Sequence, residues 1–168
     1  MKPILLDLPY PSFEDIGEDR ESATIVSPAY MGLRGELTAV LQYRFHNFYF
    51  ESYGNKETAD ILAGISIAEM KHIEILGDLI LKLGYPPVFT TEIPGMRNYS
   101  SECVSYGRDP QNMLIDDING ELNAIALYEK IICRLKNERV IAVIKRIKLD
   151  EELHVKVLRE QLEKYIKQ

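Results

Sequence analysis

Apolar side chains recur every three to four positions in four separate stretches of the chain. This spacing places them on one face of a helix. The predicted helices cover about residues 29–53, 56–83, 110–135 and 138–166. The first is rich in aromatic residues and the second has the most regular pattern. We therefore expect an all-α protein.

Turn residues divide these stretches unequally. Gly54-Asn55 separates the first two helices, and only a few polar residues separate the last two. Residues 85–109 are rich in proline and glycine and have no regular period. Asp109-Pro110 then suits a helix start, because Asp caps helices and Pro is tolerated in the first turn. Two short turns and one long connection predict an antiparallel four-helix bundle with a crossover between the second and third helices.

Residues 1–28 differ in composition from the rest. Prolines at 3, 9, 11 and 28 and an acidic cluster at 14–21 disfavour a long helix. We expect an extended N-terminal arm that contacts a partner subunit, followed by a single bundle domain over residues 29–168. A chain of 168 residues is within the usual size of one domain.

The two halves of the chain repeat a set of metal-ligand residue types. Gly35-Glu36-Leu37-Thr38-Ala39 is echoed by Gly120-Glu121-Leu122-Asn123-Ala124. Glu69-x-x-His72 is echoed by Glu151-x-x-His154. Residues i and i+3 share a helix face, so each Glu-x-x-His pair is suited to hold one metal ion.

Helix length places these residues at one depth. At about 1.5 Å rise per residue, the four carboxylates lie at similar distances from their turns. Four buried carboxylates repel one another unless cations lie among them. Two divalent ions balance the charge, and oxygen donors with some imidazole favour iron(II) or manganese(II) over structural zinc. The predicted metal ligands are also the predicted catalytic residues: Glu36, Glu69, His72, Glu121, Glu151 and His154.

Other residues near these positions have more ordinary interpretations. Tyr43 and Tyr128 each follow a lone Glu by two helical turns and are expected to hydrogen-bond to a ligating carboxylate. Met70 is expected to fill the core, which makes haem an unexpected cofactor. His46 is expected to be packed or on the surface, outside the site, and Asp117 to lie behind the ligands.

Charge and composition argue against several classes of binding partner. There are 26 acidic and 20 basic residues, and the net charge of −6 disfavours binding to nucleic acid or anionic membranes. The N-terminus lacks a secretory h-region, and no apolar run reaches the roughly 18 residues of a membrane span. Two cysteines suit a reducing compartment. We expect a cytoplasmic protein.

These motifs resemble the ferritin-like di-metal carboxylate proteins, which include rubrerythrins, bacterioferritins and manganese catalases. The resemblance implies that Glu69 and Glu151 bridge two metal ions and that Glu36 and Glu121 each bind one. Rubrerythrins carry a further carboxylate where this chain has Ala124. That departure favours a bacterioferritin-like or manganese-catalase-like centre.

The resemblance implies a di-iron oxidoreductase that reacts with O2 or H2O2, as a ferroxidase or in peroxide detoxification. One alternative is peroxide disproportionation by two manganese ions. Another is a structural or coat-type protein with a vestigial site. Aromatic residues between Tyr43 and Phe50 exceed what one core-facing stripe needs, so we expect a homo-oligomer, with a dimer favoured.

Overall fold

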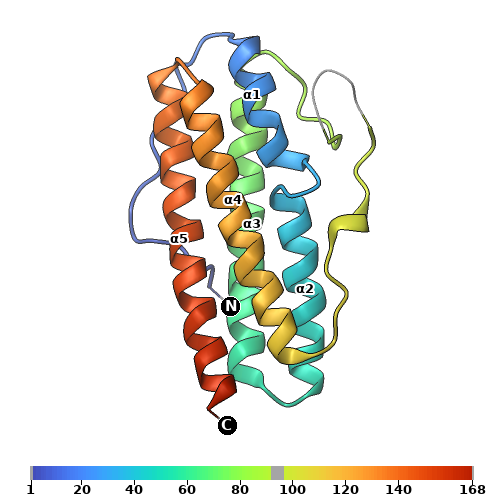
Figure 1. The fold of residues 1–168 in the computed structure, drawn as a ribbon. Helices are drawn as coiled ribbons and strands as arrows, with labels where there is room; N and C mark the ends of the chain where they lie inside the picture. The colour runs from blue at the N-terminus through green and yellow to red at the C-terminus, as the bar shows by residue number, and fades with distance from the viewer. Residues whose placement is uncertain (1, 92–96, 168) are drawn as a thin grey trace.

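The computed structural model describes residues 2–91 and 97–167. Its α-helices are α1 (Arg20–Met31), α2 (Glu36–Ser52), α3 (Lys56–Lys82), α4 (Pro110–Arg134) and α5 (Glu138–Ile166). Helices α2–α3 and α4–α5 form two antiparallel pairs, which pack into one four-helix bundle (Figure 1). A long crossover joins α3 to α4 along the outside of α2 (Figure 1). The predicted all-α bundle with its crossover is confirmed.

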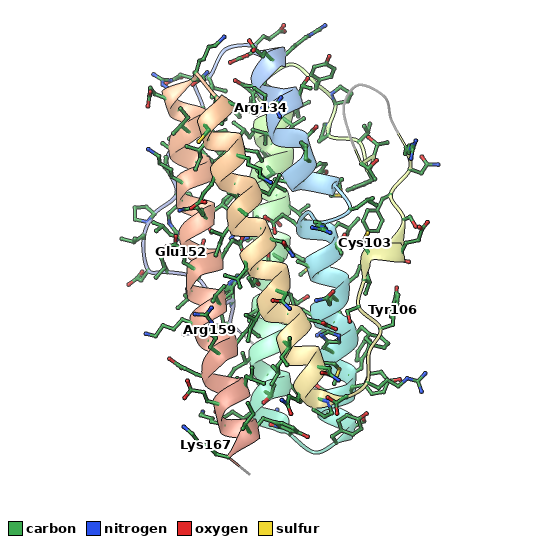
Figure 2. All side chains as sticks on the ribbon, viewed as in Figure 1. Cys103, Tyr106, Arg134, Glu152, Arg159 and Lys167 are labelled. Atoms are coloured by element: carbon green, nitrogen blue, oxygen red, sulfur yellow. The ribbon has the colours of Figure 1, made fainter. Side chains whose placement is uncertain are left out.

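The crossover contains a short 3-10 helix, η1 (Ser101–Cys103). Beyond it the chain stays close to α2, where the Ser105 amide donates a hydrogen bond to Gln42 Oε1 at 3.0 Å. Cys103 and Tyr106 lie on this outer segment (Figure 2). The part of the predicted connection at residues 92–96 is outside the described residues. None of the described helices combines the length and apolarity needed to cross a membrane.

The N-terminal region differs from the expectation of an extended arm up to residue 28. Only its first part is extended, and α1 begins at Arg20 with Asp19 as its cap. The Asp19 carboxylate accepts hydrogen bonds from the Ser22 amide and hydroxyl at 3.0 and 2.6 Å. Pro28 lies inside the helix, where it has no N–H to donate to the Thr24 carbonyl. That carbonyl accepts a hydrogen bond from Ser27 Oγ at 3.1 Å instead, so the helix continues through the proline.

The predicted single helix over 29–53 is two helices. The chain bends sharply at residues 32–35, and two glycines allow the close approach. A Cβ on Gly32 would lie 2.2 Å from the Pro28 carbonyl oxygen, and one on Gly35 would lie 2.4 Å from that of Ala29. Helix α2 therefore starts at Glu36, and α1 lies above it at the upper end of the bundle (Figure 1).

Among the described residues, the buried apolar side chains form two clusters. The first joins α1 to the ends of α3, α4 and α5 nearest to it, and includes Tyr30, Leu76, Ile80, Tyr128 and Ile144. The second lies towards the α2–α3 turn and includes Tyr43, Phe50, Leu62, Leu114 and Leu158. Along α3, α4 and α5 the repeated Glu and His residues fall between the two clusters in sequence, and Glu36 lies at the start of α2. This arrangement puts a polar layer in the middle of an apolar core.

Candidate metal centre

All six predicted ligands are buried in this middle layer. Their side chains come from all four bundle helices: Glu36 from α2, Glu69 and His72 from α3, Glu121 from α4, and Glu151 and His154 from α5. Burial of so many ionisable groups in one layer is costly unless they are paired or bind cations.

The six side chains form two overlapping groups suited to metal ions. Site 1 contains Glu36, Glu69, His72 and Glu151, and site 2 contains Glu69, Glu121, Glu151 and His154. Within each group, one potential ligand atom from every residue lies within 4.8 Å of the others. Glu69 and Glu151 belong to both groups, which is the arrangement expected of carboxylates that bridge two ions.

Each histidine directs Nδ1 at both shared carboxylates. His72 Nδ1 lies 3.2 Å from Glu69 Oε2 and 3.0 Å from Glu151 Oε1. His154 Nδ1 lies 3.0 Å from Glu69 Oε1 and 3.3 Å from Glu151 Oε2. The two oxygens of each carboxylate therefore face different histidines. Such a layer divides into two similar halves, as the sequence repeat predicts.

The two tyrosines connect opposite halves of the repeat. Tyr43 on α2 donates a hydrogen bond to Glu121 on α4, and Tyr128 on α4 donates one to Glu36 on α2. Both phenols are buried. Each Glu that belongs to only one site is thus held by a tyrosine from the facing helix, which fixes the carboxylate's orientation.

The outer nitrogens of the histidines have different partners. His72 Nε2 lies 3.3 Å from Asp150 Oδ2, to which it donates. His154 Nε2 donates to the backbone carbonyl of Ile4 at 2.8 Å. A carbonyl and an ionised carboxylate only accept, so both rings carry a proton on Nε2. This leaves the Nδ1 lone pairs available to metal ions.

Sequence reasoning missed both of these partners. Asp150 could have been predicted, because it is an acidic residue directly before the Glu-x-x-His motif. The contact with the Ile4 carbonyl could not, because every residue has a backbone carbonyl and Ile4 is far from His154 in sequence.

The electrostatics reflect crowding of like charges. Burial, together with the carboxylates of Glu69 and Glu151, raises the pKa of Glu36 and of Glu121 well above the usual range. Burial opposes a charged imidazole, yet nearby carboxylates, Glu151 for His72 and Glu121 for His154, raise both histidine pKa values. Protons therefore compensate the negative charge of the layer when cations are absent.

The shared carboxylates also show that the layer suits cations. Glu69 Oε1 and Glu151 Oε1 are buried, and within the described residues neither accepts a hydrogen bond of regular geometry, although a histidine Nδ1 lies 3.0 Å from each. Unsatisfied buried carboxylate oxygens are rare in proteins, and a metal ion is one partner that satisfies them. The donor set of carboxylate oxygens and imidazole nitrogens is suited to iron or manganese.

A cavity of about 390 Å³ reaches this layer from one side. It lies between α2 and α4, and Glu36, Glu121, Tyr43 and Tyr128 are among its lining residues. Ala124 also lines the cavity, and its small side chain leaves open a space that a larger side chain would fill. Residues 103–105 of the crossover complete the lining. The cavity provides a path by which a small molecule can reach the ligand layer.

Several other expectations have clear outcomes. Met70 is 47% exposed, so the prediction that it fills the core is wrong, and the argument against haem that depended on it no longer applies.

His46 is packed, as one of its two interpretations required, and is fully buried. Its Nδ1 lies 2.8 Å from Asp117 Oδ1. Asp117 also accepts a hydrogen bond from Gln42 at 2.9 Å.

Comparisons with known proteins agree with this geometry. The sequence model of the ferritin-like domain family matches residues 32–167. A bacterioferritin from Mycobacterium leprae is 31% identical over 134 residues, which are 77% of this chain and 78% of that protein. Bacterioferritin BfrA from Mycobacterium tuberculosis is 30% identical over 135 residues, covering 78% of this chain and 79% of the relative.

Two solved structures share the fold. The manganese catalase KatB from Anabaena superposes with a TM-score of 0.82 at 24% identity, over 92% of this chain and 77% of that one. A bacterioferritin from Rhodobacter capsulatus, described with a metal-free dinuclear site and a haem iron, gives a TM-score of 0.76 at 26% identity. That match covers 90% of this chain and 89% of the other. The bundle, the buried ligand layer and these matches together show that the chain belongs to the ferritin-like domain family.

Proposed function

We propose that this protein is a di-metal oxidoreductase that uses two ions, preferably iron, to react with O2 or H2O2. The observation that carries the proposal is the pair of overlapping sites sharing Glu69 and Glu151. Bound iron would supply the electrons that reduce the oxidant. The bacterioferritin relatives support iron, and the buried carboxylate and imidazole donors are of the types that iron binds.

The protein's own residues would bind the metal ions and fix the orientation of the ligating carboxylates. Four carboxylates neutralise two divalent ions, and the two imidazole Nδ1 atoms complete the donor set. Tyr43 and Tyr128 hold the carboxylates that border the cavity, so these do not swing into it. The apolar clusters above and below the ligand layer exclude water. Solvent and small oxidants would therefore reach the ligands through the cavity.

Two manganese ions disproportionating peroxide are the second candidate. The structure of the Anabaena manganese catalase shares the fold, and manganese(II) accepts the same donors as iron(II). Ligand type alone does not separate the two metals. Turnover does, because disproportionation releases O2 from peroxide without an added electron donor.

The test begins with metal analysis of protein purified without added metal. Anaerobic Fe(II) is then added to metal-free protein, followed by O2 or H2O2. We expect two iron ions per chain and rapid oxidation of Fe(II). Oxygen release from peroxide by the manganese form, with none by the iron form, would select the second candidate.

A matched pair of variants controls this experiment. Glu69→Gln removes a shared carboxylate, whereas Glu74→Gln changes an exposed residue on the same helix whose side chain is 67% accessible. We expect metal binding to fall sharply only in Glu69→Gln. A wild-type chain that binds neither metal would refute the oxidoreductase and leave a structural role, with a vestigial site, as the better explanation.

Subunit assembly is part of the same proposal. Of the aromatic residues on α2, Tyr43 and Phe50 are buried in the core, whereas Phe48 is 59% exposed. Phe48 is therefore available for a contact with a second copy, and we keep the expected homodimer as a proposal. Light scattering on the purified protein measures the assembly directly, and a cytoplasmic location is tested by cell fractionation.

A further inference from the structure

The extended N-terminal segment reaches the ligand layer from the side opposite the cavity. Residues 2–10, called the N-terminal strap below, begin beside α3 and α5 and continue along the outside of α5 (Figure 1). The Ile4 amide donates to the Gly64 carbonyl on α3 at 3.2 Å. The Ile4 carbonyl accepts from His154 on α5 at 2.8 Å. One residue of the strap thus joins two bundle helices at the candidate centre.

The next residues of the strap are fixed by α5. The Leu6 amide donates to Asp150 Oδ1 at 2.9 Å, and Arg146 Nη2 donates to the carbonyls of Leu6 and Leu8, both at 2.9 Å. Arg146 also forms an ion pair with Asp150 at 2.7 Å and lies over the Tyr10 ring. Asp150, which accepts from His72, is therefore held in place by the strap and by Arg146.

The sequence repeat is asymmetric at this point. In the second half, the residue before Glu-x-x-His is Asp150, and its carboxylate holds the outer nitrogen of His72. The corresponding residue in the first half is Ala68, which is buried and has no polar side-chain atom. The histidine that this position would support is His154. Its outer nitrogen is held by the Ile4 carbonyl instead.

We propose that the N-terminal strap is a positioning element of site 2, in which the Ile4 carbonyl replaces the carboxylate that Ala68 does not provide. This inference rests on the proposed di-metal function. The carbonyl fixes the ring orientation of His154 and keeps a proton on Nε2, so that Nδ1 faces the metal position. Site 2 then binds metal tightly only when Ile4 is in place, whereas site 1 has Asp150 behind its histidine, and Asp150 keeps its ion pair with Arg146 when Ile4 moves away.

Close packing at Gly64 supports this role. A Cβ on Gly64 would lie 3.1 Å from both the Lys2 carbonyl oxygen and Ile4 Cγ1. Glycine inside a helix costs about 1 kcal/mol relative to alanine. The chain has this unfavourable residue at the point where the strap crosses α3, and the missing side chain is what lets the strap approach.

The test displaces the strap without touching a ligand. Gly64→Leu places a side chain against Lys2 and Ile4. Leucine also favours the helix, so the variant is expected to fold. Anaerobic titration with Co(II), used as a spectroscopic probe, measures the two sites separately. We expect wild type to bind two ions, and Gly64→Leu to bind one ion normally and the other about 10–100-fold more weakly.

A second variant and a control make the result specific. Ala68→Asp in the Gly64→Leu background returns a carboxylate to the position before Glu69 and is expected to restore the weak site. Gly77→Ala replaces another glycine of α3 with ordinary contacts to Tyr30 and is expected to bind like wild type. NMR of the Co(II) form should show two exchangeable imidazole N–H signals, one of which exchanges rapidly in Gly64→Leu.

The outcomes separate the two proposals. Wild type that binds no Co(II) pair would refute the di-metal function itself. If wild type binds two ions and Gly64→Leu binds both equally well, or loses both equally, the strap does not position site 2. Failure of Ala68→Asp to recover the weak site would also overturn the inference.

Discussion

At the scale of single residues, surroundings decide what a glutamate does. Glu69 and Glu74 are both on α3, yet Glu69 is fully buried among ligand groups and the Glu74 side chain is 67% accessible and paired with Lys71. A surface pair of this kind contributes at most about 1 kcal/mol to stability. A buried carboxylate needs a cation or a proton. The residue type is the same, and its place on the helix sets its chemistry.

The tyrosine hydrogen bonds give a prediction at this scale. Tyr43→Phe and Tyr128→Phe remove one hydroxyl each with little change in packing. Glu121 or Glu36 then loses the group that orients it, and metal affinity is expected to fall about 10–100-fold. Metal titration measures the change. Tyr165→Phe, at the end of α5, is the control, and unchanged affinity in both site variants would show that the phenols do not orient the ligands.

At the scale of elements, α1 takes the place of the upper part of α2, because α2 begins only at the level of the ligand layer. Helix α2 starts at Glu36, so above the ligand layer the bundle lacks one of its four helices. Helix α1 covers that gap with buried residues that include Val26, Ala29 and Met31. The sharp bend at residues 32–35 also sets Glu36 in the first turn of α2, at the level of the other ligands. The extra helix is therefore part of how the site is built.

The cap of α1 gives a prediction at this scale. Asp19→Ala removes the N-cap and is expected to lower the free energy of unfolding by about 1 kcal/mol at pH 7. Hydrogen bonds from Ser22 hold the pKa of Asp19 below the usual aspartate value of 3.8. The stabilisation is therefore fully present above pH 3.8 and is lost as pH falls further, when the carboxyl takes up a proton.

Urea unfolding at several pH values measures this effect. The difference between wild type and Asp19→Ala should narrow below about pH 4. Asp15→Ala changes an exposed residue in the same segment and is the control. Equal stability of wild type and Asp19→Ala at pH 7 would contradict the capping role.

At the scale of the whole molecule, the bundle holds a charged layer between two apolar clusters. All four bundle helices contribute to this layer, the crossover lines the cavity that reaches it, and the N-terminal strap contacts one of its histidines. The cavity opens to it between α2 and α4, and the strap covers it on the α3–α5 side. The layer is therefore accessible from one side and supported from the other, which fits the proposed reaction with a small oxidant.

Metal removal should therefore weaken the whole fold. Free metal at 100 times Kd stabilises the folded state by about 2.7 kcal/mol. For a chain of this size that corresponds to a rise in Tm of roughly 5–10 °C. Thermal unfolding with metal and with chelator measures the difference. A Tm that does not respond to metal would count against binding in the bundle.

The effect of one substitution on stability should change sign between the metal-free and the metal-bound protein. Glu121→Gln keeps an oxygen for Tyr43 but removes a negative charge from the layer. With chelator it is expected to be more stable than wild type at pH 7, because wild-type Glu121 has to take up a proton when the metal-free chain folds, whereas Gln does not. With metal it is expected to be less stable, because a ligand charge is lost. Glu129→Gln on the exposed face of α4, where the side chain is 59% accessible, should change neither value.

The sequence by itself determined the four bundle helices, the crossover and the six residues of the ligand layer. Helical periodicity and the repeated Glu and Glu-x-x-His segments are local patterns, and a fixed rise per residue converts them into depth. The helix bounds agree within a few residues from Lys56 onward. The roles of these residues as metal ligands remain a proposal.

The tertiary structure decided what depends on contacts between distant segments. Helix α1 forms despite Pro28 because Ser27 satisfies the Thr24 carbonyl, and the bend after it depends on close backbone approach. The exposure of Met70 was settled by which face of α3 turns outward. The Ile4 carbonyl reaches His154 only after the chain has folded, because a backbone group carries no signal in the sequence. Residue types therefore specified the ligand layer, and folding chose the groups that hold it in place.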